Sequence, residues 1–254
     1  MPIAHRIAGS GPVHVIGLHG WFGSSDGWGA LPDLIDPAAY TYAFMDYRGY
    51  GQRQSETGEF TLEEISQDCQ QLADELGWDT FAVLGHSMGG AAALRVLCDV
   101  PERVTAVIGV SPVPASGVPF DDDGRALFHG AAQQDENRYA ILDLTTGNRL
   151  SSYWLQSMVE FSRKHSTPEA IAGYLTAWSE ANFVAELPEV TVPVTAIVGE
   201  HDPALGTDTM KATWLTHIPS CELVTMANAG HYAMNETPIA LATHLEQALS
   251  GFGQ

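Results

Sequence analysis

The sequence predicts an α/β protein with a mostly parallel central sheet and helices on both of its faces. Three observations predict this class. Short runs rich in β-branched and aromatic residues alternate with segments of helical periodicity. The 254 residues are 45% hydrophobic and 17% charged, which is enough to bury one sizeable core. One run also passes from an apolar stretch, through a serine bracketed by glycines, directly into a helical pattern. One principal domain is therefore expected.

Short apolar runs bounded by turn residues give the predicted strands. Such runs are typical of buried strands in a parallel sheet, and they span residues 13–18, 40–45, 81–84, 104–110, 194–198 and 221–226. Between the second and third runs, residues 62–76 carry apolar side chains at the spacing of an amphipathic helix: Leu62, Ile65, Cys69, Leu72 and Leu76. Thr61 is predicted to cap this helix, and Glu64 three residues later completes a capping box.

The regular alternation stops after the fourth run. From about residue 120 to 187 the chain becomes helical and irregular, and strand character resumes beyond Pro188 and Pro193. The segment opens with the acidic triplet Asp121, Asp122 and Asp123, which suits a solvated loop or a helix start. This pattern indicates an insertion into the sheet domain.

The stretch VLGHSMGGAAALRVL, residues 83–97, predicts a sharp turn from strand to helix with Ser87 at its tip. Gly85 and Gly89 stand where a Cβ atom would collide as strand and helix pack closely, and Gly90 extends the clearance. The helix beginning at Met88 would direct unpaired N–H groups and its positive dipole end towards charge developing near the Ser87 hydroxyl. These features make Ser87 a candidate nucleophile.

A serine nucleophile needs a base, and the base needs an orienting acid. Asp202 follows the run at 194–198, and His231 lies in the loop after the run at 221–226. Each candidate thus follows the carboxyl end of a strand, where open parallel sheets bind their ligands. Glu200 and Asp208 are the fallback acids.

Composition excludes several partners and sites. The formal charge of −20 repels nucleic acid phosphates and anionic lipids, and it favours solubility. Cys69, Cys98 and Cys221 are scattered and odd in number, so neither a disulfide framework nor a zinc site is expected. No apolar stretch approaches the roughly 18 residues of a spanning helix. We expect a cytoplasmic protein, a monomer or homodimer, without nucleic acid or membrane partners.

Four motifs together resemble the α/β-hydrolase superfamily over nearly the whole chain. They are LHGWFGSSDGW at 18–28, MDYRGYGQR at 45–53, GHSMGG at 85–90, and the pair GEHDP and AGHY near Asp202 and His231. The order Ser, Asp, His is also that of these enzymes. The chain is most similar to small serine esterases, lactonases and cofactor-free haloperoxidase-like hydrolases.

The resemblance implies a site and a division of the chain. It implies a triad of Ser87, Asp202 and His231, with an oxyanion hole formed by the main-chain N–H groups of Trp21 and Met88; Phe22 is the alternative donor. It implies a sheet of about seven strands and a helical cap inserted after the sixth strand. The core would then comprise residues 1–115 and 188–254, and the cap residues 116–187.

Several residues of the motifs are expected to be structural. His19 is expected to brace the oxyanion loop, and Asp46 and Arg48 to fix the turn after their strand through hydrogen bonds. The remaining histidines show no metal-ligand spacing, and neither a metal nor a cofactor is expected. Aromatic residues of the cap and the loops are expected to form a largely apolar pocket, with Phe22, Trp154, Trp178 and Tyr232 as its candidate residues.

The sequence therefore favours a serine hydrolase that cleaves a carboxylic ester or lactone through an acyl-enzyme. Its partner would be a small to medium, uncharged hydrophobic or aromatic substrate. Two alternatives stay open, since fold does not dictate function. The same residues could act on thioester, amide or carbon–carbon bonds, or the protein could be a slow-turnover small-molecule receptor.

Overall fold

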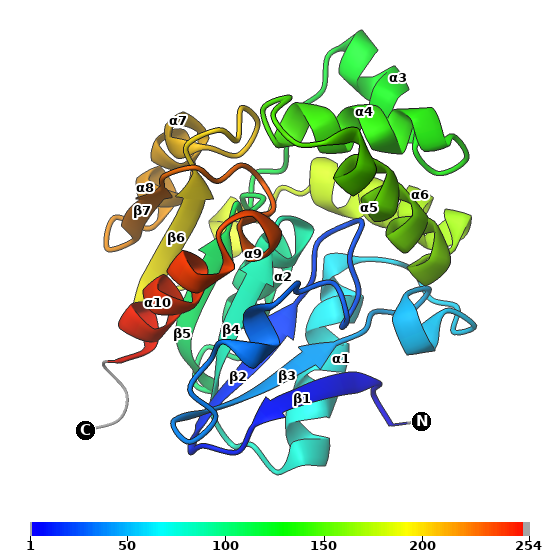
Figure 1. Cartoon of the computed structure of the whole chain (residues 1–254). Helices are drawn as coiled ribbons and strands as arrows, with labels where there is room; N and C mark the ends of the chain where they lie inside the picture. The colour runs from blue at the N-terminus through cyan, green and yellow to red at the C-terminus, as the bar shows by residue number, and fades with distance from the viewer. Residues whose placement is uncertain (1, 251–254) are drawn as a thin grey trace.

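The computed structural model describes residues 2–250 and contains a seven-stranded sheet (Figure 1). The strand order is β1-β3-β2-β4-β5-β6-β7; β1 pairs antiparallel with β3, and the other neighbours are parallel. The strands are β1 (His5–Gly9), β2 (Val13–Leu18), β3 (Tyr40–Met45), β4 (Phe81–His86), β5 (Val104–Val110), β6 (Val194–Gly199) and β7 (Glu222–Met226). The mostly parallel α/β fold predicted from the sequence is confirmed.

The register brings the carboxyl ends of the parallel strands to one edge. Leu18 of β2 pairs with Met45 of β3 and with Gly85 of β4. Val110 of β5 in turn pairs with Ile197 of β6. The loops that follow these strands therefore emerge side by side, and they carry the four sequence motifs.

Helices cover both faces of the sheet. In Figure 1, α1 and α2 lie on one face and α10 on the other. The helices of the sheet domain are α1 (Leu62–Leu76), α2 (Met88–Asp99), α7 (Thr207–Ala212), α8 (Trp214–His217), α9 (Ala233–Glu236) and α10 (Pro238–Leu249). Short 3-10 turns occupy η1 (Leu31–Asp33), η2 (Gly51–Arg53) and η3 (Val184–Glu186). Because both faces are covered, every residue of β4 is buried.

Four further helices, which we call the four-helix insertion, lie between β5 and β6 in the chain. They gather beyond the carboxyl ends of the strands (Figure 1), and they are α3 (Asp122–Gly130), α4 (Asp135–Thr145), α5 (Ser152–His165) and α6 (Pro168–Ser179). In this chain they follow the fifth strand, not the sixth, because the single strand β1 precedes Val13. Asp121 caps α3 by accepting from Gly124 N, so the acidic triplet is a helix start.

The predicted helix at 62–76 is confirmed, but only one of the two hydrogen bonds of the predicted capping box forms. Thr61 Oγ1 accepts from Glu64 N at 3.1 Å, as expected of a capping residue. The Glu64 carboxylate, however, accepts from the N–H groups of Glu59 and Phe60 instead of that of Thr61. It thereby fixes the chain that leads into the helix.

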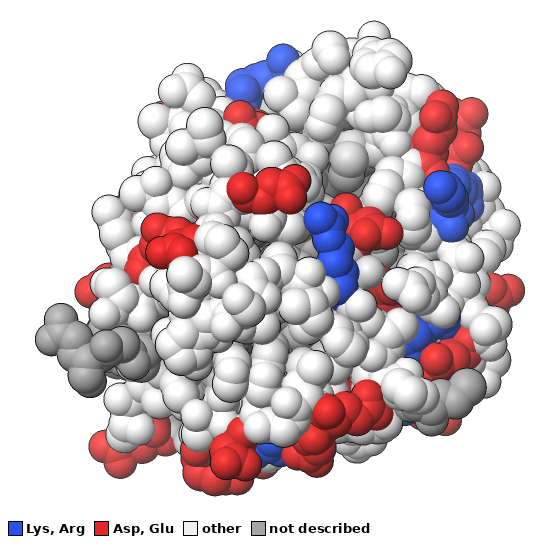
Figure 2. Space-filling model, turned by 60° about the horizontal axis from the view of Figure 1, so that its bottom comes forward, with Lys and Arg blue, Asp and Glu red and all other residues white. Residues whose placement is uncertain are grey.

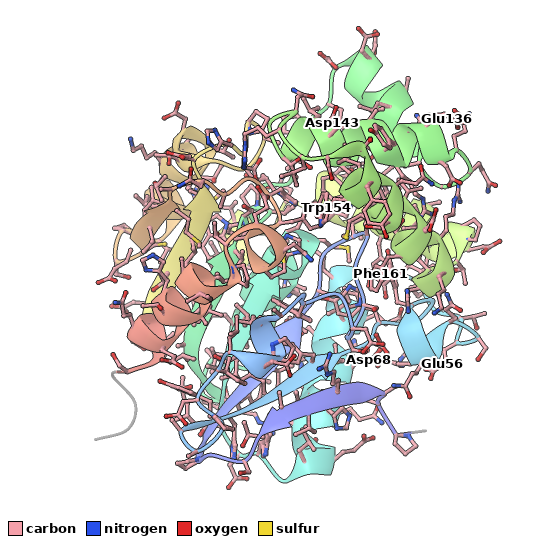
Figure 3. All side chains as sticks on the ribbon, viewed as in Figure 1. Glu56, Asp68, Glu136, Asp143, Trp154 and Phe161 are labelled. Carbon is pink, nitrogen blue, oxygen red and sulfur yellow. The ribbon has the colours of Figure 1, made fainter. Side chains whose placement is uncertain are left out.

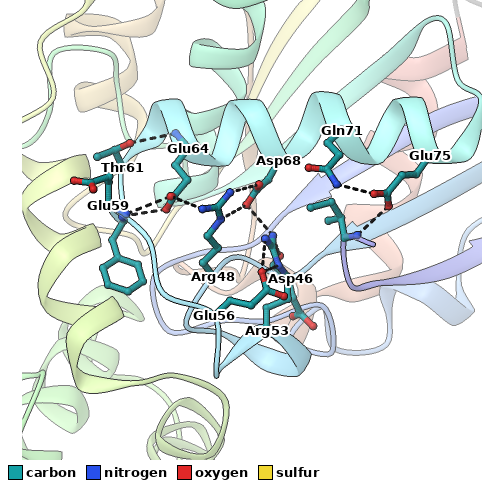
Figure 4. A network of polar contacts seen from close by, with 12 residues as sticks. Asp46, Arg48, Arg53, Glu56, Glu59, Thr61, Glu64, Asp68, Gln71 and Glu75 are labelled. Atoms are coloured by element: carbon teal, nitrogen blue, oxygen red, sulfur yellow. Dashed lines mark hydrogen bonds and ion pairs between the residues drawn. The ribbon is translucent and has the colours of Figure 1, made fainter. Parts of the chain in front are cut away.

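A cluster of charged side chains holds the turn between β3 and α1 (Figure 4). Asp46 accepts from Ser25 N and Gln52 N, so it fixes this turn as predicted.

Arg48 of the same turn contacts helix α1, where it lies 2.8 Å from Glu64 and 2.9 Å from Asp68. The buried carboxylate of Asp68 also binds Arg53 at 2.8 Å, so one acidic residue of α1 joins two arginines of the turn.

One face of the molecule shows how part of the acidic excess is arranged. On the face shown in Figure 2, acidic side chains are scattered around the molecule and do not form one patch. Within residues 2–250, no helix has the length and apolar character that crossing a membrane requires.

Candidate active site

Ser87 occupies the sharp turn that the sequence predicted, between the last residue of β4 and the first of α2. Its backbone angles, φ 54° and ψ −118°, fall in a region that residues other than glycine rarely adopt, and such strain costs about 1–3 kcal/mol. A Cβ atom on Gly85 would overlap the Gly89 carbonyl oxygen, and one on Gly89 would overlap that of Leu18. Strand and helix therefore pack at a distance that only glycine permits at these two positions.

Asp202 and His231 form a buried hydrogen-bonded pair. His231 Nδ1 lies 2.7 Å from Asp202 Oδ2, and Asp202 Oδ1 accepts from the N–H groups of Ala204 and Leu205 at 3.0 Å each. Burial alone would raise the pKa of the Asp202 carboxyl, but His231 and the two N–H groups bring it below its ordinary value. The carboxylate is therefore ionised at neutral pH and holds the imidazole in one orientation.

The main chain of His231 is held from two directions. Its N–H donates to Thr145 O of α4 at 3.2 Å, and its carbonyl accepts from His86 Nε2 at 3.0 Å. Burial, together with the neighbouring His231, lowers the pKa of His86 to about 3, so this ring is neutral at physiological pH. His86 is thus a packing and hydrogen-bonding residue beside Ser87.

The two fallback acids lie elsewhere. Glu200 accepts from Asn228 N at 2.7 Å and lies 3.2 Å from His201 Nε2. Asp208 is exposed on α7. Of the three candidate acids, Asp202 is the one that contacts His231.

Ser87 and His231 line one cavity of about 250 Å³. No hydrogen bond joins the Ser87 hydroxyl to a described residue; the hydrogen bond between a candidate nucleophile and its base is often long in a structure without substrate. The sheet domain contributes the loop from His19 to Gly23, Trp28, Leu205, Tyr232 and Met234 to the lining. The four-helix insertion and the segments flanking it contribute Val118, Phe120, Phe128, Ile141, Leu144, Thr145, Met158, Phe161 and Trp178.

The lining is largely apolar and carries no fixed charge. Among the described residues, neither an aspartate, a glutamate, a lysine nor an arginine lines this cavity. Aromatic rings dominate one wall, where Trp21 packs against Phe22 with ring centroids 4.5 Å apart and against Trp178 at 5.7 Å. An uncharged, hydrophobic ligand suits such a cavity because a buried charge would have no partner in its wall.

Three of the four predicted pocket residues line this cavity: Phe22, Trp178 and Tyr232. Trp154 is not among its lining residues; its ring instead makes a T-shaped contact with that of Tyr232, with centroids 5.7 Å apart. Trp154 and Phe161 both project from α5 (Figure 3), yet Phe161 is the one that reaches the cavity. The residues of α4 and α5 that do line the cavity were not among the predicted pocket residues, because their apolar spacing fits the helix core equally well.

The two predicted oxyanion donors flank Ser87. Met88 is the first residue of α2, and Trp21 lies in the loop after β2. Gly20 brings this loop close, since a Cβ atom there would lie 3.2 Å from Ser87 Cβ. Within the described loops and turns, neither Trp21 nor Met88 donates its main-chain N–H to another residue, so both N–H groups are free to bind an oxyanion.

His19 braces this loop, as expected. Its ring stacks on Tyr47 with centroids 3.8 Å apart, and its Nδ1 lies 2.8 Å from the Gly20 carbonyl. Burial lowers the pKa of His19 to about 4, so the ring is neutral near pH 7. Among residues 2–250, His, Cys, Asp and Glu nowhere gather in a group of three that could hold a metal ion.

A model of the alpha/beta hydrolase fold family matches residues 13–238 of the chain. The dihydrolipoyllysine-residue acetyltransferase component of the acetoin cleaving system of Cupriavidus necator is 38% identical over 164 residues, which are 64% of this chain and 43% of that longer protein. The pimeloyl-[acyl-carrier protein] methyl ester esterase of Nitrosomonas europaea is 26% identical, over 88% of this chain and 90% of that protein.

Among solved structures, the chain is similar to an esterase from Exiguobacterium antarcticum. The TM-score is 0.84 at 19% sequence identity, and the superposition covers 98% of this chain and 95% of the esterase. At this identity the likeness concerns the fold alone.

Proposed function

We propose that this chain, which belongs to the alpha/beta hydrolase fold family, is a serine hydrolase that cleaves a carboxylic ester or lactone through an acyl-enzyme. One observation carries the proposal. Asp202 and His231 form a hydrogen-bonded pair at the same cavity into which the strained turn presents Ser87. A scaffold gains nothing from strain at a serine, whereas a nucleophile gains exposure from it.

In the proposed mechanism, His231 takes the proton of the Ser87 hydroxyl as its oxygen attacks the substrate carbonyl. Asp202 keeps the proton of His231 on Nδ1 and stabilises the imidazolium that forms. The N–H groups of Trp21 and Met88 bind the oxyanion. The histidine then gives its proton to the leaving alkoxide, and water activated by the same histidine releases the acid.

The proposed substrate is uncharged, hydrophobic and small to medium in size. The uncharged wall and the volume of about 250 Å³ support this proposal. We further propose that residues 116–187 form a cap over the site, between core segments 1–115 and 188–254. Helices α4, α5 and α6 of this segment all contribute residues to the cavity wall.

Hydrolysis of p-nitrophenyl acetate and butyrate, followed through burst and steady state, tests the proposal. We expect repeated turnover by the wild type and a loss of several orders of magnitude in Ser87→Ala. Ser220→Ala, an exposed serine distant in sequence from the motifs, is the matched control and should match the wild type. A single acylation without turnover would favour the receptor alternative, and equal rates for wild type and Ser87→Ala would refute the triad.

A further inference from the structure

The carbonyl and indole of Trp21 are both tied down by residues that do not line the cavity. Tyr50 OH donates to Trp21 O at 2.7 Å, and Trp21 Nε1 donates to Ile171 O of α6 at 2.9 Å. Both bonds are buried. Trp21 therefore has its main-chain carbonyl fixed from the sheet domain and its side chain fixed from the four-helix insertion.

Tyr50 is itself held between the sheet domain and α6. It is fully buried, and its ring centroid lies 5.7 Å from that of Tyr174 on α6. The adjoining main chain reaches the same part of the insertion, where Thr167 N donates to Gly49 O at 3.0 Å and Tyr50 forms an isolated bridge with Ser166. The turn after β3 and the start of α6 thus form one hydrogen-bonded unit around Trp21.

The orientation of a peptide plane decides where its N–H points. The Trp21 N–H shares its peptide plane with the Gly20 carbonyl, which accepts from Gly23 N at 2.9 Å. Tyr47 OH holds the His19 carbonyl, in the plane before it, at 2.9 Å, and Tyr50 OH holds the Trp21 carbonyl, in the plane after it. Between them these three bonds fix the course of the loop that presents the Trp21 N–H beside Ser87. A donor of an oxyanion hole acts through alignment, and a displacement of about 1 Å can cost 100-fold in rate.

We propose that Tyr50 and helix α6 position the oxyanion donor Trp21. The position of the four-helix insertion on the sheet domain would then set the rate of acyl transfer. The inference rests on the proposed function and adds residues outside the triad to it. Tyr50 acts through Trp21 and touches no substrate. A ligand that shifts α6 would therefore change the rate of the chemical step and not only its own affinity.

The test compares Tyr50→Phe with Tyr42→Phe. Tyr42 is an equally buried tyrosine, on β3, whose hydroxyl has no hydrogen-bond partner, so its variant removes the same atom without removing a bond. For Tyr50→Phe we expect kcat for p-nitrophenyl butyrate to fall about tenfold with KM within about twofold. Acylation and deacylation should slow by the same factor, because both pass through an oxyanion.

A second variant removes the hydrogen bond between Trp21 and the four-helix insertion. Trp21→Phe removes the indole N–H that binds Ile171 O, and Trp214→Phe, at a buried indole whose Nε1 has no partner, is its control. Butylboronic acid, which places an oxygen where the oxyanion forms, should bind Tyr50→Phe and Trp21→Phe more weakly by the factor lost in kcat. Neither control should change.

The outcomes separate this inference from the proposed function. A Tyr50→Phe enzyme with wild-type kcat and boronate affinity would overturn the inference and leave the serine hydrolase intact. An equal loss in Tyr42→Phe would also overturn it, because the effect would then come from the fold. A wild type unable to hydrolyse any ester would overturn the proposed function and the inference together.

Discussion

Replacing Asp202 by asparagine should disable His231, and the hydrogen bonds of the carboxylate show why. The N–H groups of Ala204 and Leu205 both point at Oδ1, so the amide oxygen of an asparagine must take that place. Its NH₂ group then faces His231 Nδ1, 2.7 Å from the present Oδ2. Two donors cannot face each other, so the proton of the imidazole moves to Nε2, and the ring can no longer accept the Ser87 proton.

The expected loss in kcat is about 10⁴-fold, as when the acid of a serine protease triad becomes its amide. It corresponds to about 5.4 kcal/mol in the activation free energy at about 1.36 kcal/mol per factor of ten. The assay is steady-state hydrolysis of p-nitrophenyl butyrate near neutral pH, with KM expected to change little. Thermal unfolding of the same samples shows whether Asp202→Asn is folded.

The fallback acids supply the controls for this variant. Glu200→Gln and Asp208→Asn should retain wild-type kcat, because neither side chain contacts His231. The reasoning is refuted if Asp202→Asn keeps more than about a tenth of the wild-type kcat, or if Glu200→Gln loses as much.

Three further predictions concern stability and specificity. Asp68→Asn should lower the unfolding free energy by about 3 kcal/mol and Tm by roughly 6–12 °C, since it removes the buried carboxylate that two arginines of the turn share. The exposed control Asp74→Asn should cost at most about 1 kcal/mol, and equal losses in the two variants would contradict this prediction. The pKa values of His19 and His86, about 4 and 3 against an ordinary 6.5, mean that the unfolded chain binds more protons below pH 6.5. Urea unfolding should therefore show stability falling from pH 6.5 towards 4, by about 1.4 kcal/mol per pH unit for each ring, and His19→Asn should flatten the fall. Trp178→Ala should raise kcat/KM for p-nitrophenyl decanoate relative to butyrate about tenfold, because the indole bounds the cavity; an unchanged ratio would place the acyl chain elsewhere.

Much of the fold could be predicted from the sequence because its signals are local. Apolar runs of four to seven residues, Thr61 three residues before Glu64, and the glycines around Ser87 each act within one turn of chain. Strand β1 had no such signal. It lies at the sheet edge, pairs with β3 alone and is only partly buried, so it lacks a continuous apolar run.

The walls of the cavity could not be predicted in the same way. Periodicity shows that a helical face is apolar, but it does not say whether a helix or an empty space lies opposite. Phe161 and Trp154 lie seven residues apart on α5, and only Phe161 lines the cavity. The partners of Arg48 were equally hidden, because its contacts with Glu64 and Asp68 depend on where α1 packs.

The placement of the four-helix insertion between two neighbouring strands has an evolutionary consequence. The chain leaves the sheet at Val110 of β5 and re-enters it on the neighbouring parallel strand at Val194, which pairs with Val107. The entropy of closing such a loop grows only slowly with its length. Selection can therefore lengthen, shorten or replace this one segment, and so change which molecules fit the cavity. Ser87 lies before the inserted segment in the chain, and Asp202 and His231 lie after it. The proposed chemistry can therefore be inherited unchanged while the substrate diverges.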